Sequence, residues 1–161
     1  MITKAESSAP PPETGGGVLA DEMGMGKSLS ILSLITRTLE NAHVWAGDSN
    51  LAQSSDPPAA KHYSRATLIV VSSGLLLNSW NSEIDKHLDG TLKIIKYHGQ
   101  KRETQIPVLA DSDIVLTTYH TLAADFGAKK SPNHRIAWFR VVLDEGKPAA
   151  ISSTANFSVQ D

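Results

Sequence analysis

Apolar positions along the chain fall into two patterns that follow one another. Short runs, mostly of β-branched residues, predict strands at 17–20, 67–71, 92–97, 113–117 and 140–144. Apolar residues repeated every three or four positions predict helices at 27–41, across 76–88, at 105–110 and at 119–125. Because strands alternate with helices, we predict an α/β fold with a parallel, doubly wound sheet.

Two of these helices should be buried in different ways. The 27–41 helix carries Leu and Ile on most of its faces, so we expect it to pack deep against the sheet. The 76–88 helix has one apolar stripe, formed by Leu76, Trp80, Ile84 and Leu88. We interpret this stripe as core, and Trp80 as a core residue rather than a base-stacking one.

Two segments show neither pattern. Residues 1–16 are rich in Pro, Ser and Gly, which predicts a disordered tail. Residues 42–65 are polar and contain Pro57 and Pro58, which predicts a loop or a disordered insertion. The remaining span, 17–161, is short enough to form a single domain.

Composition narrows the function classes. Cysteine is absent, which excludes disulfides and thiolate metal sites. The net charge is −2, whereas nucleic-acid modules are usually basic, so any DNA contact should be local. The basic candidates for a DNA contact are Lys86, His87, Lys93, Lys96, Lys101 and Arg102. For each of them the alternative is an ordinary solvated surface. The longest mostly apolar run, 68–77, is far shorter than the roughly 20 residues of a membrane span, so we expect a soluble chain. The lack of cysteine, and of an apolar secretory signal in residues 1–17, fits an intracellular one.

The segment from Asp21 to Ser28 has the chemistry of a phosphate-binding loop. It follows a predicted strand and opens a predicted helix, where backbone N–H groups and the helix dipole favour a phosphate. Lys27 would reach the β- and γ-phosphates of ATP, and the Ser28 hydroxyl would ligate Mg²⁺. The nucleotide-binding candidates are Asp21, Glu22, Met23, Gly24, Met25, Gly26, Lys27 and Ser28. The alternative is a Gly-rich turn that binds nothing.

Two acids end the last predicted strand. Asp144 and Glu145 follow Val141-Val142-Leu143, and in a phosphate-loop ATPase the first acid holds the metal and the second orients or deprotonates the attacking water. We therefore assign Ser28 and Asp144 as metal ligands, and Lys27 and Glu145 as catalytic residues. An isolated Asp-Glu would more often be a turn, but both sites belong at the carboxyl edge of the sheet.

The motifs resemble those of the Swi/Snf-like ATPases of helicase superfamily two. Residues 18–28, 67–84 and 113–119, the last reading DIVLTTY, match the family in register over 15–147. Residues 121–126 and 138–145 are most similar to the helicase-like transcription factor and post-replication-repair branch, whose members often carry a RING insertion. The resemblance implies part of the first RecA-like lobe of a nuclear ATPase that translocates on duplex DNA in chromatin remodelling or repair. It also implies DNA-backbone contacts by Thr117, Thr118 and Tyr119, although strand and helix-cap hydroxyls are an equal alternative.

The chain also departs from this family. Lys147 replaces a His, and Ala149, Ala150 and Ile151 stand where relatives have Ile-Arg-Asn, so coupling between nucleotide and DNA is in doubt. No strand equivalent to the family's third motif and no second ATPase lobe are evident, so we expect negligible hydrolysis by this chain alone. A non-catalytic remnant that binds nucleotide weakly, or only contacts a partner, is therefore an alternative. A small phosphate-loop kinase is a weaker one, because no lid with arginines is evident.

Overall fold

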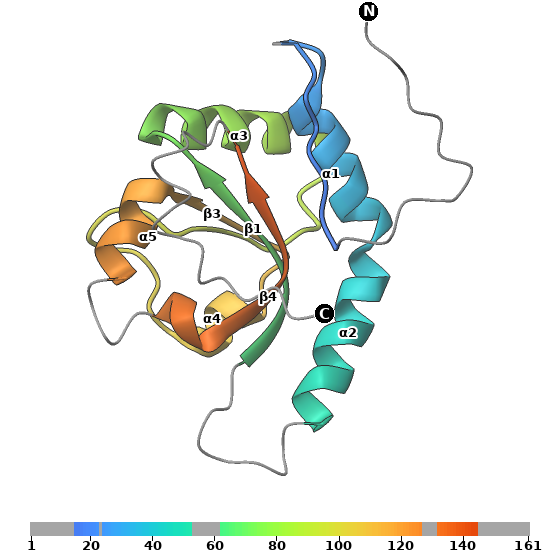
Figure 1. The fold of residues 1–161 in the computed structure, drawn as a ribbon, viewed down its shortest axis with the longest axis vertical. Helices are drawn as coiled ribbons and strands as arrows, with labels where there is room; N and C mark the ends of the chain where they lie inside the picture. The colour runs from blue at the N-terminus through green and yellow to red at the C-terminus, as the bar shows by residue number, and fades with distance from the viewer. Residues whose placement is uncertain (1–14, 23, 53–61, 127–131, 145–161) are drawn as a thin grey trace, which may run out of the picture.

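Four parallel strands form one sheet at the centre of the molecule (Figure 1). A computed structural model describes residues 15–22, 24–52, 62–126 and 132–144. The strands are β1 (His62–Val71), β2 (Ile94–Lys96), β3 (Ile114–Thr118) and β4 (Ile136–Leu143), in the order β2-β3-β1-β4. The central strand β1 pairs in parallel with both β3 and β4. The apolar run that predicted it is buried on both sides, as expected of a covered parallel strand.

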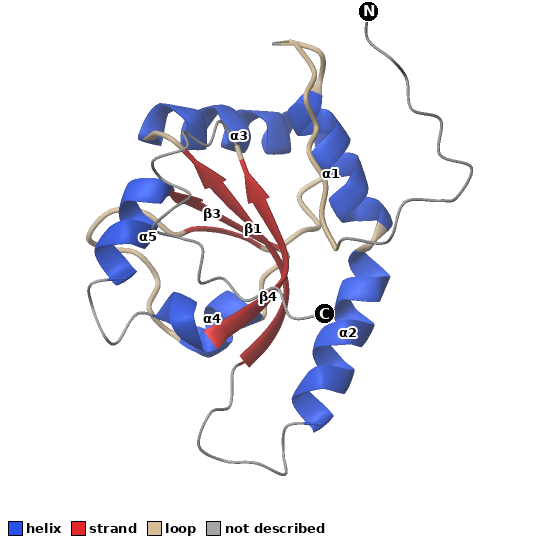
Figure 2. Cartoon of the chain, viewed as in Figure 1, coloured by secondary structure: helices blue, strands red, loops and turns tan. Residues whose placement is uncertain are grey.

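Helices cover both faces of this sheet (Figure 2). They are α1 (Lys27–Arg37), α2 (Leu39–Ala52), α3 (Gly74–His87), α4 (Ile106–Ala110) and α5 (Tyr119–Phe126), and a 3₁₀ helix spans Pro132–Arg135. The helices α1 and α3 pack on one face, and α4 and α5 on the other. The predicted α/β fold with a parallel, doubly wound sheet is therefore confirmed, and the arrangement is RecA-like.

Each face of the sheet has its own apolar core. On the α1/α3 face, Leu32 and Ile35 of α1 meet Trp80 and Ile84 of α3 above Ile69 of the central strand. The other core contains Leu68, Val70, Tyr97, Leu109, Val115 and Leu122. The predicted stripe on α3 is thus confirmed at Trp80 and Ile84, whereas Leu76 and Leu88 are partly buried at its margin.

The predicted strand at 17–20 is wrong. These residues lie outside the sheet, and Val18 is 93% exposed. A strand needs a hydrogen-bonded neighbour, and none of the described strands pairs with this segment. Gly15, Gly16 and Gly17 also make an extended conformation entropically costly, so four residues cannot hold one unaided.

The predicted loop at 42–65 is also wrong over all of its described part. Helix α2 runs through residue 52, and β1 begins at residue 62; residues 53–61 lie outside the described residues. The helix packs by a narrow face on which Ala42, Trp45, Ala46 and Ser49 recur at helical spacing. The Trp45 ring lies 5.2 Å from that of Tyr63 and 5.6 Å from that of Phe139. Small residues around one aromatic give this face little hydrophobic signal in the sequence.

The predicted 27–41 helix divides at Thr38. Its hydroxyl donates to the Leu34 carbonyl at 2.7 Å and accepts from Nη2 of Arg140 at 2.9 Å, which fixes the junction between α1 and α2. The expectation of deep packing on most faces is wrong, because Leu29 and Leu34 are each 43% exposed. Only the side of α1 that carries Leu32 and Ile35 is buried among the described residues.

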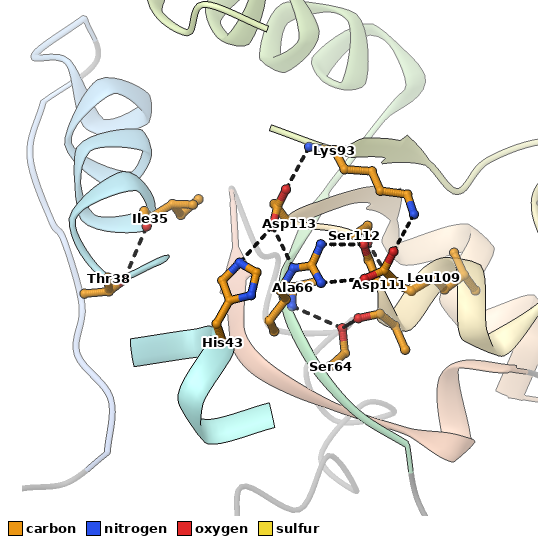
Figure 3. Close-up of polar contacts among 12 residues, drawn as sticks. Ile35, Thr38, His43, Ser64, Ala66, Lys93, Leu109, Asp111, Ser112 and Asp113 are labelled. Atoms are coloured by element: carbon orange, nitrogen blue, oxygen red, sulfur yellow. Dashed lines mark hydrogen bonds and ion pairs between the residues drawn. The ribbon is translucent and has the colours of Figure 1, made fainter. Parts of the chain in front are cut away.

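A cluster of charged side chains beside the amino end of β3 connects that segment to β1, to α2 and to the segment before β2 (Figure 3). Nε of Arg65 donates to Oδ1 of Asp113 at 2.9 Å, and its Nη1 donates to Asp111. Lys93 donates its backbone N–H to Asp113 and its ammonium to Asp111. His43 of α2 lies 3.9 Å from the same Asp113 carboxylate. This cluster sits at the edge of the sheet opposite to the strand ends that carry Asp144, so its role is structural.

Candidate nucleotide and metal site

The loop before α1 turns on two glycines. Gly24 and Gly26 have φ of 83° and 79°, in the left-handed region that side chains disfavour. The Met25 N–H donates to the Glu22 carbonyl at 3.4 Å, a weak bond that closes the turn. Met23 lies outside the described residues. The loop is exposed, so its backbone can be reached from solvent.

Lys27 folds back over this loop. Its ammonium donates to the carbonyl oxygens of Asp21 and Glu22 at 2.7 and 2.9 Å. Both partners are neutral backbone acceptors. A phosphate oxygen would be a stronger, charge-assisted acceptor for the same ammonium.

The first turn of α1 has the properties of an anion site. Its N-cap is Gly26, which offers no side chain to bond the amides of the first turn. Those N–H groups and the positive end of the helix dipole favour an anion. Ser28 lies in this turn and is half-buried. Lys27 and Ser28 thus lie in the first turn of α1, directly after the loop, and their role in binding nucleotide stays a prediction.

Asp144 follows β4 on the same face of the sheet as α1. Its N–H donates to the Val70 carbonyl at 2.9 Å, which continues the β1/β4 ladder. Its Oδ2 accepts a hydrogen bond from Nε1 of Trp80, at 2.7 Å. Trp80 belongs to α3 and shares its core with Leu32 of α1. In Figure 1 the first turn of α1 and the arrowheads of β1 and β4 lie toward the same end of the molecule. The acid and the loop therefore share a face and an end of the sheet.

The donor set is one that suits Mg²⁺. Ser28 and Asp144 supply a hydroxyl and a carboxylate oxygen, which are hard ligands, and Mg²⁺ is usually held by one or two carboxylates together with substrate phosphates. A dedicated cage is not needed, and no group of three His, Asp or Glu suited to a metal occurs within the described ranges. Glu145, the predicted water-activating acid, lies outside the described residues, as do Lys147, Ala149, Ala150 and Ile151.

The predicted DNA-contacting residues end β3 and begin α5. Thr117 and Thr118 are 0% and 2% exposed. The Thr118 hydroxyl accepts from the Thr121 N–H at 3.1 Å, which is a helix cap. The hydroxyls of Thr117 and Tyr119 are buried, with no hydrogen-bond partner among the described residues. Burial and, secondarily, the charge of Asp144 raise the pKa of Tyr119 above its ordinary value.

Most of the basic candidates have local partners. Lys93 pairs with Asp111, and Arg102 pairs with Asp125. Lys96 donates to Asn78 at 2.8 Å, and His87 lies 3.3 Å from Glu83. These contacts favour the solvated-surface alternative for the four residues.

Trp80 is the residue at this site that sequence reasoning missed. Its place in an apolar stripe indicated core, and that is confirmed by its 3% exposure. Its bond to Asp144 joins positions 64 residues apart, and nothing in the local pattern signals such a pair. The only available hint was that a buried indole N–H needs an acceptor.

Comparison with known proteins identifies the family. The fold is that of a RecA-like α/β domain. The SNF2-related domain matches residues 11–157, so the chain belongs to the SNF2-related domain family. The resemblance drawn from the motifs is thereby confirmed.

Three relatives illustrate the match. The chain is 31% identical to the Arabidopsis thaliana SWI/SNF-related matrix-associated actin-dependent regulator of chromatin subfamily A member 3-like 1, over 89% of this chain and 20% of that protein. It is 32% identical to DNA repair protein RAD5A of Arabidopsis thaliana, over 81% and 16%. It is 42% identical to the human helicase-like transcription factor, over 51% and 8%. The chain thus spans a fifth or less of each of these relatives.

None of the helices in the described residues has both the length and the apolar character needed to cross a membrane.

Proposed function

We propose that this chain is the ATP-binding lobe of a nuclear, DNA-dependent ATPase that translocates on duplex DNA in chromatin remodelling or repair. Membership of the SNF2-related domain family supports this, as do the relatives named for chromatin regulation and DNA repair. The single observation that carries it is the placement of the Lys27 loop and Asp144 on one face and at one end of the sheet.

In this proposal each side chain has one task. Lys27 exchanges its two loop carbonyls for β- and γ-phosphate oxygens of ATP. The Ser28 hydroxyl and the free oxygen of Asp144 would hold Mg²⁺, whose charge would offset that of the phosphates. Glu145 orients or deprotonates the attacking water. Gly24 and Gly26 let the loop backbone approach the phosphates closely.

The DNA contact would lie at the strand end next to the nucleotide. Thr117, Thr118 and Tyr119 occupy the junction of β3 and α5, where burial and, secondarily, the charge of Asp144 raise the pKa of Tyr119. A contact with the DNA backbone here would require this junction to open, because its threonines are buried.

The non-catalytic remnant remains the second candidate. Lys147, Ala149, Ala150 and Ile151 favour it, because polar residues that would couple nucleotide to DNA are replaced. In that case the chain binds nucleotide weakly, or only contacts a partner.

Two measurements test the proposal. Titration of ATP with Mg²⁺ into the chain should show an affinity that Lys27→Ala lowers about tenfold or more, a loss of about 1.4 kcal/mol or greater. Lys101→Ala, which removes an exposed lysine outside the loop, should leave it unchanged. Equal affinities for the wild type and Lys27→Ala would refute nucleotide binding at this loop. ATP turnover measured with and without duplex DNA separates the two candidates, since DNA-stimulated turnover by this chain would rule out the remnant.

A further inference from the structure

The indole of Trp80 is fixed in place before it reaches Asp144. It projects from α3, whose first turn is capped by the Ser73 hydroxyl accepting from the Leu76 N–H at 3.3 Å. Leu77 and Ile84 of the same helix are buried beside it in the core. At 3% exposure the ring has little freedom to rotate.

Asp144 is held from two directions. Its backbone is fixed by the Val70 carbonyl of β1, and its Oδ2 by the Trp80 N–H of α3 at 2.7 Å. Rotation of the carboxylate would break the second bond and leave a buried indole N–H without an acceptor, which is costly. Within the described residues, no hydrogen bond is made to the other oxygen, Oδ1.

We infer that Trp80 is a positioning residue for the metal-binding carboxylate: its N–H fixes Asp144 in one rotamer and leaves Oδ1 as the oxygen for a divalent cation. The inference rests on the proposed function, in which Asp144 holds Mg²⁺. On this inference, helix α3 sets the affinity of the metal site through Trp80, although it belongs to neither the phosphate loop nor the acidic strand.

The chemistry of indole suits this role. Its nitrogen is a donor only, so it can neither ligate the cation nor take a proton from the acid. Donors that orient ligating carboxylates contribute strongly to metal sites, and removing them commonly costs 10–100-fold in metal affinity. Trp80→Phe keeps an aromatic ring in the core and removes the N–H.

A matched control lies in the same chain. Trp138 of β4 also has a buried indole N–H, but that N–H has no hydrogen-bond partner among the described residues. Trp138→Phe therefore removes a similar volume and a similar group without touching Asp144. Thermal unfolding of both variants reports the loss of packing separately from the metal site.

The test is the gain in ADP affinity caused by Mg²⁺. ADP is titrated into the wild type, Trp80→Phe and Trp138→Phe, in excess Mg²⁺ and again in EDTA, and the ratio of the two affinities is compared. We expect Trp80→Phe to reduce this ratio about 10–100-fold while leaving the EDTA affinity within about twofold. Trp138→Phe should keep the wild-type ratio.

The outcomes separate this inference from the proposed function. A wild type whose ADP affinity does not depend on Mg²⁺ would contradict the proposed metal site itself. If Mg²⁺ raises the ADP affinity of the wild type and Trp80→Phe keeps the same ratio, the role of Trp80 is overturned and the proposed metal site stands. A larger ratio in Trp80→Phe would also overturn that role, because the N–H would then compete with the metal.

A second measurement covers the case in which Trp80→Phe does not fold. The chain has three tryptophans, so Trp45→Phe with Trp138→Phe leaves Trp80 as the only indole. In that background, Mg²⁺ added to the ADP complex should shift Trp80 fluorescence, and Asp144→Asn should abolish the shift. No shift on adding Mg²⁺, or a shift that survives Asp144→Asn, would contradict the inference.

Discussion

Arg102 and Asp125 form an ion pair in which Nη2 of the guanidinium lies 2.6 Å from Oδ1 of the carboxylate. Asp125 is 4% exposed, and its other oxygen accepts from the Tyr97 hydroxyl at 2.5 Å and from Asn133 at 3.2 Å. Burial and the bond to Asp125 raise the pKa of Tyr97, so it stays the donor in this pair. One carboxylate thereby joins the segment after β2 to α5 and the 3₁₀ helix.

This cluster predicts a large cost for a small change. Asp125→Asn keeps the shape of the side chain but removes the charge that faces Arg102, so the free energy of unfolding should fall by about 2 kcal/mol. The loss is smaller than for a fully buried pair because Arg102 is partly exposed. Urea unfolding measures it, and Asp85→Asn on the exposed side of α3 is the control. Equal stabilities of the two variants would contradict this account of the cluster.

Acid should weaken the charged cluster of Arg65, Lys93 and Asp111 beside the amino end of β3. Hydrogen bonds from Lys93 and then Arg65 lower the pKa of Asp111 below its ordinary value of 3.8. A lowered pKa in the fold means that the ionised acid stabilises the protein above about pH 4, and that this contribution is lost as the pH falls through the folded pKa.

Asp111→Asn should therefore destabilise the chain by about 0.5–1 kcal/mol near neutral pH, since Asp111 is largely exposed. The difference from wild type should shrink as the pH falls below about 4 and through the lowered pKa of the folded state. Thermal unfolding followed across pH measures this. A difference that grows on acidification would have the wrong sign for a lowered pKa.

The docking of α2 should depend on one aromatic side chain. Trp45 packs against Tyr63 and Phe139, and Trp45→Ala should lower the free energy of unfolding by about 2 kcal/mol. Val44→Ala, on the exposed side of the same helix, should change it by less than about 0.5 kcal/mol. Hydrogen exchange of the α2 amides should rise in the first variant only. Unchanged exchange in Trp45→Ala would contradict this interface.

Two glycines offer a matched pair of substitutions. A side chain at Gly26, with φ of 79°, would strain the backbone by about 1–2 kcal/mol, so Gly26→Ala should distort the loop and weaken ADP binding. Gly47 lies inside α2, where an added Cβ would meet nothing within 4 Å. Gly47→Ala should therefore stabilise the chain by about 0.5–1 kcal/mol and leave ADP binding unchanged. Equal ADP affinity in both variants would argue against a role for the loop conformation.

The parts of the fold that the sequence predicts are those with a strong local pattern. The runs 67–71 and 113–117 are continuous and β-branched, and both are buried strands. The 17–20 segment is also a short apolar run. It forms no strand, because strand pairing depends on a neighbouring strand that the local sequence does not reveal. Helix α2 was missed because its buried face is mostly Ala and Ser, whose burial depends on the Tyr63 and Phe139 rings brought to it by the sheet.

At the candidate site, too, the sequence suggests the local features but not the contacts that depend on tertiary packing. Lys27 and Ser28 could be assigned from spacing because a loop and a helix start are local structures. The link between Trp80 and Asp144 could not, because it arises only when α3 packs beside the end of β4.

The most direct test of the central claim compares Lys27 with Asp144 as partners around one Mg²⁺-bound nucleotide. Calorimetric titration of ADP, in Mg²⁺ and in EDTA, is made with wild type, Lys27→Ala and Asp144→Asn. We predict that Lys27→Ala weakens binding under both conditions, whereas Asp144→Asn removes only the gain given by Mg²⁺. An Asp144→Asn variant that retains the full Mg²⁺-dependent gain would contradict the claim.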